Sequence, residues 1–250
     1  MPAKTKIAWT ENVWNPVTGC SKRSRGCEHC YAEVMARRLK GMGLEKYKNG
    51  FEVTLHPEEL DKPKQVKKPT MFFVCSMGDL FHTHVPFEFI DQVMETIKSC
   101  PQHTFQILTK RAERMYRYFE THEVPKNAWL GVSVETIDYS ERALYLAKIP
   151  NVTVRFLSCE PLLGPLDELP LDNIDWVICG GESGQQARPV CKEWVFRLKS
   201  DCDKADVPFF FKQWGTWGED GVKRNVKENG CLIDGREYKA WPKITMENEK

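Results

Sequence analysis

The sequence of 250 residues predicts an α/β protein whose parallel sheet forms a partial or near-complete β/α (TIM-like) barrel with a small C-terminal hairpin extension. Three observations support this fold class. Short apolar runs alternate with helical patterns along the chain. The apolar runs are continuous, which is typical of strands buried on both faces. Polar residues follow most of these runs, at the strand ends that meet on one face of such a barrel.

Seven apolar runs, each bounded by turn or polar residues, are the predicted strands. They are Val13–Val17, Met71–Cys75, Phe105–Leu108, Trp129–Val134, Val152–Leu157, Trp176–Cys179 and Pro208–Phe211. About six or seven strand–helix units favour a full or partial barrel over an open doubly wound sheet.

Helices are predicted between the strands, where apolar residues recur at helical spacing. They cover Tyr31–Leu39, a segment from Pro86 to Ile97, Ala112–Phe119, Ser140–Ala147 and Glu193–Ala205. The Pro- and Asp-rich segment Leu163–Asp175 predicts a short helix or none.

Two further segments interrupt this alternation. Gly41–Lys68 is a charged insertion without a clear pattern. Near the end, Asn229-Gly230 and Asp234-Gly235 flank Cys231–Ile233, which predicts a small hairpin. We therefore expect one β/α-barrel domain over residues 1–250, with residues 215–250 as a C-terminal extension.

Overall charge and hydropathy exclude several classes of protein. The net charge is +1 and the pI is near 7.5, so bulk charge does not indicate a nucleic-acid-binding protein. No apolar run approaches the roughly 18 residues that span a bilayer. The first residues, Met1–Lys6, lack the apolar stretch of a secretory signal. We therefore expect a cytoplasmic protein with no membrane partner.

Three of the ten cysteines lie close together, and their grouping requires a chemical explanation. Cys20, Cys27 and Cys30 have the spacing C-x6-C-x2-C and occupy the loop between the first strand and the first helix. Disulfides are rare in a reducing cytosol, and thiolates are soft ligands for zinc or iron–sulfur clusters. Gly19 and Gly26 each precede a cysteine and allow tight turns there.

An iron–sulfur cluster fits this pattern better than zinc. A structural zinc site takes four ligands, usually as two pairs, and only one C-x2-C pair is present. His29 lies between the paired cysteines, where it does not easily reach the same metal. Three local cysteines fit a cubane cluster with one iron open to a substrate or cofactor. A zinc-stabilised nucleic-acid- or protein-binding module without catalysis is the alternative.

Carboxylates and small polar residues follow several predicted strands. Ser76, Gly78 and Asp79 follow the second strand. The residues Ser133, Glu135, Ser158, Glu160 and Glu182 lie at the ends of the fourth, fifth and sixth strands. Because these ends converge in a β/α barrel, we expect a shared site there.

In its cysteine loop and its β/α units, the chain resembles the radical S-adenosylmethionine superfamily. The superfamily's usual spacing is C-x3-C-x2-C, and the first gap is longer here. More closely, the chain is similar to the phage-associated three-Cys-motif family. The shared residues are Trp14-Asn-Pro, the loop from Gly19-Cys20 to Cys30-Tyr31-Ala, Ser158-Cys-Glu-Pro-Leu and Gly180-Gly-Glu-Ser-Gly. This resemblance covers nearly the whole chain.

The resemblance implies a mechanism. Cys20, Cys27 and Cys30 would hold a [4Fe-4S] cluster whose fourth iron chelates the amino and carboxylate groups of S-adenosylmethionine. An electron donor such as flavodoxin or ferredoxin would reduce the cluster. One electron would then cleave a carbon–sulfur bond, and the carbon radical, usually 5′-deoxyadenosyl, would abstract hydrogen from a substrate. The resemblance leaves that substrate open.

The resemblance also suggests residues that contact the cofactor. In the superfamily a Gly-Gly-Glu segment after the second strand contacts the methionine amino group. Here Gly180-Gly181-Glu182 follows the sixth strand, so Ser76, Gly78 and Asp79 are the better candidates. The remaining candidates for contacts with ribose, methionine or substrate are Ser133, Glu135, Ser158 and Glu160. Tyr31 follows the last cysteine and is a candidate to pack over the cluster.

A nucleic acid is one substrate class that local features favour. Basic residues surround Arg23 and Arg111, and the segment Trp214-Gly-Thr-Trp217-Gly offers aromatic rings that we expect to be exposed. Exposed aromatic rings beside cations can stack on bases.

Overall fold

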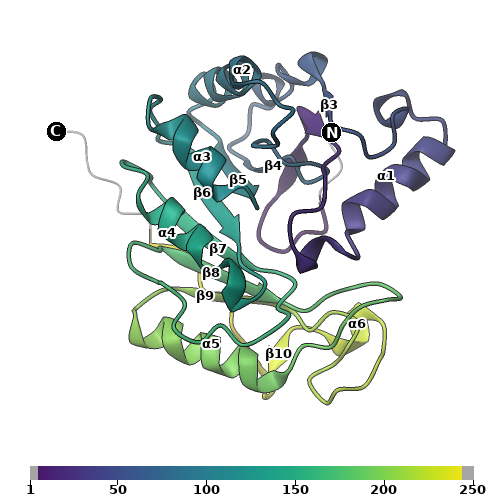
Figure 1. Ribbon diagram of the computed structural model, residues 1–250, viewed down its shortest axis with the longest axis vertical. Coiled ribbons are helices and arrows are strands. Elements are labelled where there is room, and N and C mark those ends of the chain that lie inside the picture. Colours follow the sequence, from purple (N-terminus) through teal and green to yellow (C-terminus); the bar gives the residue numbers. More distant parts are fainter. Residues whose placement is uncertain (1–4, 244–250) are drawn as a thin grey trace.

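In the computed structural model, which describes residues 5–243, a curled sheet of seven parallel strands forms the centre of the molecule (Figure 1). The strands, in their order across the sheet, are β1 (Asn12–Trp14), β4 (Met71–Val74), β5 (Thr104–Thr109), β6 (Ala128–Ser133), β7 (Arg155–Cys159), β8 (Trp176–Gly180) and β9 (Phe209–Gln213). Strands β1 and β9 form the two edges, so the barrel is partial, as predicted.

Helices connect the strands and follow the outside of the curled sheet (Figure 1). They are α1 (Tyr31–Gly41), α2 (Phe87–Lys98), α3 (Ala112–Phe119), α4 (Glu141–Ala147), α5 (Lys192–Lys204) and the short α6 (Val226–Asn229). No helix lies between β7 and β8, which agrees with the prediction for that segment. Among the described residues, none of the helices combines the length and apolarity that crossing a membrane requires.

The prediction of one strand over Val13–Val17 is wrong. Strand β1 ends at Trp14, because Pro16 has no N–H to donate and restricts the residue before it. The chain turns there, and Val17–Thr18 (β2) pairs antiparallel with Thr54–Leu55 (β3). The charged insertion therefore supplies the partner strand that positions the start of the cysteine loop.

The rest of the insertion is irregular. It contains the short 3-10 helices η2 (Glu45–Tyr47), η3 (Pro57–Glu59) and η4 (Pro63–Gln65). Glu59 is buried in this segment and pairs with Lys46 (2.8 Å) and Lys62 (2.7 Å). The insertion is therefore a folded cover beside β1 and β2.

The C-terminal hairpin is present, and the segment after it closes one edge of the sheet. Leu232–Ile233 (β10) pairs antiparallel with Arg236–Glu237 (β11). Tyr238 O then accepts from Phe211 N (2.7 Å), and Ala240 N donates to Phe209 O (3.1 Å). The backbone edge of β9 is thus covered, which removes a site for unwanted strand pairing. The division into a barrel domain and an extension stays a prediction.

The two faces of the sheet have different cores. The outer face packs mostly aliphatic residues against the helices, as with Val74, Ile107 and Leu130. The inner, concave face is filled by aromatic residues. The buried cluster there contains Trp9, Phe73, Trp129, Val154, Phe156, Trp176, Ile178 and Phe210. This aromatic floor closes the interior below the carboxyl ends of the strands.

Strand register explains how the aromatic floor is packed. Gly131 lies opposite Phe156, which in turn lies opposite Trp176. A Cβ atom on Gly131 would meet the Phe156 ring at 2.4 Å, so the glycine provides the space for that ring. Further up the same face come Ser133, Ser158 and Lys212, so the interior becomes polar toward the carboxyl edge.

Candidate functional site

The cysteine loop lies at the carboxyl edge of the sheet. Cys20 follows β2, Cys27 ends the 3-10 helix η1 (Arg25–Cys27), and Cys30 is the N-cap of α1. Gly19 N donates to Met77 O (2.9 Å), and Cys20 N donates to Phe51 O (3.1 Å). Gly19 has a φ of +82°, and a Cβ there would lie 2.1 Å from the Glu52 carbonyl oxygen. Only glycine fits this close approach, as the sequence suggested.

Glu135 anchors the middle of the cysteine loop. Its side chain is 0% exposed and accepts hydrogen bonds from Ser24 Oγ (2.7 Å), Arg142 Nη1 (2.9 Å) and Lys110 Nζ. Burial opposes ionisation of this carboxyl, but the charges of Lys110 and Arg142 prevail and lower its pKa. A Cβ on Gly26 would lie 2.5 Å from Glu135 Oε1, so the loop backbone packs directly on this carboxylate.

Glu182 and Arg188 anchor the end of the loop from the opposite side. Arg188 donates to Glu182 Oε1 (2.6 Å), to Glu28 Oε2 (2.7 Å) and to Arg25 O (3.0 Å). His29 Nδ1 lies 3.3 Å from Glu182 Oε2. Burial again opposes ionisation of Glu182, and its hydrogen bonds with Arg188 lower its pKa. His29 therefore faces a carboxylate of the β8 loop.

A third anchor holds the loop directly after Cys20. Ser21 Oγ accepts from Arg111 Nη2 (2.9 Å) and lies 2.8 Å from His82 Nε2. His82 Nδ1 accepts from His84 N (3.1 Å), so the neutral ring carries its proton on Nε2 and donates it to Ser21. Burial, and then the charge of Arg111, lower the pKa of His82 to about 4.

The predicted site residues after the second strand of the sheet support this loop. Asp79 accepts from Thr109 Oγ1 (2.7 Å) and from Phe81 N (3.0 Å). A Cβ on Gly78 would lie 3.0 Å from the carbonyl oxygens of Gly19 and Val17. Asp79 is therefore held by protein donors, and Gly78 packs on the base of the cysteine loop.

Tyr31 and Ser76 form the adjoining part of the site. The Tyr31 hydroxyl donates to Ser76 O (2.5 Å), while 58% of the Tyr31 residue surface is exposed. Ser76 Oγ donates to Asn15 Oδ1 (3.2 Å), which also accepts from Met77 N (3.0 Å). Tyr31 thus spans from the cysteine loop to the end of β4.

Above the aromatic floor, the interior contains the carboxylate of Glu160, together with the groups that bind it. Glu160 accepts from Ser158 Oγ (3.4 Å) and Trp9 Nε1 (3.3 Å), and it pairs with Lys212 Nζ (2.9 Å). Ser133 lies beside Ser158 in the register of β6 and β7, and its carbonyl accepts from Arg142 (2.7 Å). These groups belong to adjacent strand ends, so the predicted convergence at one edge is present.

Both oxygens of Glu135 accept from protein donors, and its contact with a cofactor stays a prediction. The expectation that Trp214 is exposed is wrong. Trp214 is 1% exposed and its Nε1 donates to Leu232 O (2.7 Å). Trp217 is half-buried and donates to Ala187 O (2.6 Å). Both rings pack the C-terminal extension.

Sequence reasoning missed several residues that hold the site together: Trp9, Ser24, His82, Arg142 and Arg188. The Gly180-Gly181 pair has a packing explanation, because a Cβ on Gly181 would lie 1.9 Å from Trp214 O. The glycine pair itself was a signal in the sequence that another backbone passes close to this strand end.

The chemistry of the loop fits a soft metal group. Burial, and next the negative charge of Asp79, raise the pKa of the Cys20 thiol to about 12; burial also raises the pKa of Cys30. Cys27 makes a smaller contribution that raises both pKa values further. Arg23 N points at Cys27 Sγ (3.5 Å). A bound metal would displace the thiol protons.

The donor set of the loop is three free thiols, Cys20, Cys27 and Cys30. Thiolates are soft ligands that suit zinc or an iron–sulfur cluster. A structural zinc takes four ligands, whereas a cubane cluster with one open iron takes three thiolates, each at a different iron. Within residues 5–243, no group of three or more His, Cys, Asp or Glu side chains is placed to hold one ion.

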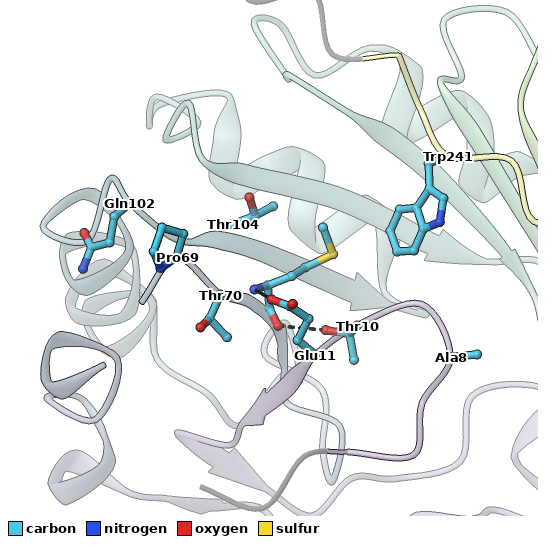
Figure 2. A pocket seen from close by; sticks show the side chains of 9 residues that line it. Ala8, Thr10, Glu11, Pro69, Thr70, Gln102, Thr104 and Trp241 are labelled. Carbon is cyan, nitrogen blue, oxygen red and sulfur yellow. Dashed lines mark hydrogen bonds between the residues drawn. The ribbon is translucent and has the colours of Figure 1, made fainter. Parts of the chain in front are cut away.

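A separate pocket of about 460 Å³ lies at the opposite, amino end of the sheet. Its lining includes Thr10, Glu11, Met71, Thr104 and Trp241 (Figure 2). The backbone of Met71 is held by Glu11 Oε2 (2.9 Å) and Thr10 Oγ1 (3.1 Å), shown as dashed lines in Figure 2. None of the predicted site residues lines this pocket.

These features define a class: a parallel half-barrel protein with a three-cysteine loop anchored at its carboxyl edge. Residues 4–242 match the family described as "Protein of unknown function (DUF5131)", and the chain belongs to that family. Among curated proteins, none matches the sequence. The phage-associated family stays a prediction.

Solved structures of spore photoproduct lyase are similar in part. One mutant has a TM-score of 0.49 and 10% identity, with coverage of 73% of this chain and 58% of that chain. The enzyme complexed with dinucleoside spore photoproduct has a TM-score of 0.49 and 11% identity, covering 82% and 64%. A double mutant with bound AdoMet and the same dinucleoside has a TM-score of 0.48 and 12% identity, covering 72% and 58%. The chain thus spans less than two thirds of their length.

Proposed function

We propose that this protein is an iron–sulfur enzyme that reductively cleaves S-adenosylmethionine to start radical chemistry on an organic substrate. One observation carries the proposal. Three thiols lie on one loop at the carboxyl edge of a parallel half-barrel, and three separate polar anchors hold that loop in place. Active sites of β/α barrels lie at this edge.

In this proposal Cys20, Cys27 and Cys30 hold a [4Fe-4S] cluster and leave one iron open. When bound, the cluster supplies the electron that cleaves S-adenosylmethionine, and the protein orients the reactants and excludes water. The aromatic floor closes the interior from below, so a reactive species formed above it is kept from bulk solvent on that side.

The protein's own residues then divide into two groups. The first group is Tyr31 with Ser76 and Ser158 with Glu160, each pair joined by a hydrogen bond, and it would bind and orient S-adenosylmethionine. Glu160, which pairs with Lys212 (2.9 Å), would supply a carboxylate for a cationic group of that molecule.

The remaining predicted residues would act through the loop. Asp79 and Glu135 are saturated by protein donors, and Gly78 packs on the loop backbone. Ser133 is buried, and its carbonyl holds Arg142, a partner of Glu135. We propose these as positioning residues.

All ten cysteines are free thiols. Free thiols persist in reducing compartments, and disulfides do not. We therefore propose a cytoplasmic location, which is also where a low-potential electron donor would be available.

Anaerobic purification and reconstitution test the proposed function. Iron, sulfide and zinc are measured per chain, and electron paramagnetic resonance spectra are recorded with and without S-adenosylmethionine. We expect about four irons per chain and a reduced signal that S-adenosylmethionine perturbs. About one zinc with no iron would instead establish a zinc-stabilised binding module.

Matched cysteine variants assign the ligands. Cys20→Ala, Cys27→Ala or Cys30→Ala should abolish cluster binding, whereas Cys231→Ala, in the C-terminal extension, should retain it. Equal loss of iron in the Cys231 variant would refute the assignment of the three loop cysteines as the cluster ligands. Binding of single-stranded RNA or DNA, measured at low and high salt, tests whether the substrate is a nucleic acid.

A further inference from the structure

Exposed apolar side chains are concentrated beside the cysteine loop. Ten large hydrophobic residues are exposed in the described part of the chain, and five of them fall within residues 31–44. These five are Tyr31, Val34, Met35, Met42 and Leu44. Val34 is 68% exposed and Met42 is 63% exposed. Such a concentration marks an interaction surface more often than isolated exposed residues do.

Helical spacing places most of these residues on one side of α1. Val34, Met35, Arg38 and Met42 follow one another at intervals of one to four residues along this side. The opposite side, with Ala32 and Ala36, is buried against Tyr47 and Met77. We call the exposed side, with Val34, Met35, Arg38 and Met42, the α1 face. Helix α1 lies at the periphery of the molecule (Figure 1).

The surroundings of the α1 face are positively charged. Residues 21–45 carry six cations and three carboxylates, in a chain with a net charge of +1. The exposed cations of this stretch are Lys22, Arg23, Arg25, Arg37, Arg38 and Lys40. All three carboxylates are already paired: Glu33 with Arg37 (2.5 Å), Glu28 with Arg188 (2.7 Å) and Glu45 with Lys48 (2.6 Å). The surface therefore favours an acidic partner.

The α1 face adjoins the cysteines directly. Cys30 is the N-cap residue of α1, so Val34 lies about one helical turn, roughly 5 Å, from that cysteine along the helix axis. A partner bound here would lie beside the loop. The site requires an electron from outside the chain, and electron transfer needs the two redox groups close together.

We propose that the α1 face docks an acidic one-electron carrier protein, which reduces the iron–sulfur site. This inference rests on the proposed function. In the step, the carrier's flavin or iron–sulfur group is oxidised by one electron and the site on the cysteine loop is reduced by one. The exposed valine and methionines favour a protein partner over a nucleic acid, because a phosphate backbone offers them no apolar surface. Methionine also adapts to partners of different shape.

The test uses the reconstituted full-length chain and a reduced, acidic flavodoxin. The variants Val34→Glu and Arg38→Glu place negative charge on the α1 face without touching the buried side of the helix. Leu144→Glu, at an exposed leucine of α4, is the matched control. Iron content and reduction by dithionite are measured first, because they report the site independently of any protein partner.

We expect reduction by flavodoxin to slow at least about tenfold in Val34→Glu and severalfold in Arg38→Glu, as expected for losing apolar and charge contacts at an interface. Iron content and dithionite reduction should be unchanged, and Leu144→Glu should match the unaltered protein. Unchanged flavodoxin reduction in both α1 variants would overturn the docking surface and leave the proposed function intact.

Other outcomes also overturn the docking proposal. Conversion of a dimer to a monomer by Val34→Glu, seen by light scattering, would make the α1 face a contact between copies of this chain. Loss of RNA or DNA binding with unchanged flavodoxin reduction would make it a nucleic-acid surface. A chain that binds no iron at all would refute the proposed function, and the docking proposal with it.

Discussion

The two ends of the curled sheet fill the same interior by different means. At the carboxyl end, buried charged groups such as Glu135 and Glu182 hold the cysteine loop through directed hydrogen bonds. At the amino end, aromatic rings such as Phe156 and Trp176 fill the space mainly by packing, with ring centroids 6.0 Å apart. Packing fixes shape, whereas charged hydrogen bonds fix individual groups at defined points. The carboxyl end needs individual groups at defined points, because it holds the cysteine loop.

The largest expected effect on stability comes from the amino end. Phe156→Ala should lower the free energy of unfolding by about 3–5 kcal/mol, because the ring is fully buried between Trp9 and Trp176. Urea denaturation measures this loss, and Phe156→Leu should lose less. Iron bound per folded chain should remain the same in both variants. A comparable loss of iron would show that the two ends are not independent.

At the carboxyl end, Glu135→Gln should lower stability by about 2 kcal/mol, since Lys110 and Arg142 lose their counter-charge. Unlike the amino-end variants, it should also lower iron content severalfold, because the neutral amide holds Ser24, Lys110 and Arg142 more weakly and the cysteine loop packs on this group. Iron analysis after anaerobic reconstitution measures this. Glu141→Gln, at an exposed glutamate of α4, serves as the control. Full iron content in Glu135→Gln would argue against its positioning role.

Lowering the pH below neutrality should first reduce the stability of the carboxyl end. His82 is buried, and burial with Arg111, His84 and Arg114 lowers its pKa to about 4, whereas an unfolded histidine titrates near 6.5. As the pH falls, His82 therefore takes up a proton in the unfolded chain before it does so in the folded protein. The stabilisation from neutral His82 is complete above about pH 6.5, decreases as the pH falls, and is lost near pH 4.

The expected decrease over that window is at most about 3 kcal/mol. Denaturation at about pH 7, 6 and 5 measures it, above the range where most carboxylates titrate. His82→Asn keeps an acceptor for His84 N and removes the titration, so its stability should change less with pH. An equal pH dependence in both proteins would remove His82 as the cause.

The smallest effect is expected at the rim of the amino end. Trp241 is 41% exposed and stacks on Trp176 with ring centroids 4.9 Å apart. Trp241→Ala should lower stability by about 1 kcal/mol and leave iron content unchanged. A loss as large as that of Phe156→Ala would mean that the rim belongs to the aromatic floor.

The strands were predictable from sequence because burial on both faces requires continuous apolar runs. Ala112–Phe119 was predicted with the bounds that α3 has. The order of carboxylates along the edge was also accessible, since Glu135, Glu160 and Glu182 each follow an apolar run. Local patterns thus identified the elements and the edge that carries the site.

The contacts across the edge were not predictable, because they join residues far apart in the chain. Ser24 and Glu135 are 111 residues apart, and Arg188 and Arg25 are 163 apart. No local pattern distinguishes a carboxylate that binds a ligand from one that is saturated by Arg142 and Lys110. Trp214, in the segment Trp214-Gly-Thr-Trp217-Gly, was expected to be exposed, but it is buried and its indole donates to Leu232 O in the C-terminal extension.

The position of Trp9 has a consequence for the order of folding. The indole of this residue lies against Phe73 and Phe156 and donates to Glu160, which is synthesised 151 residues later. Gln106 also binds its carbonyl oxygen (3.0 Å). During translation the N-terminal segment must therefore wait until β7 has emerged from the ribosome. The interior of the half-barrel is completed late, and contacts of such long sequence separation slow folding.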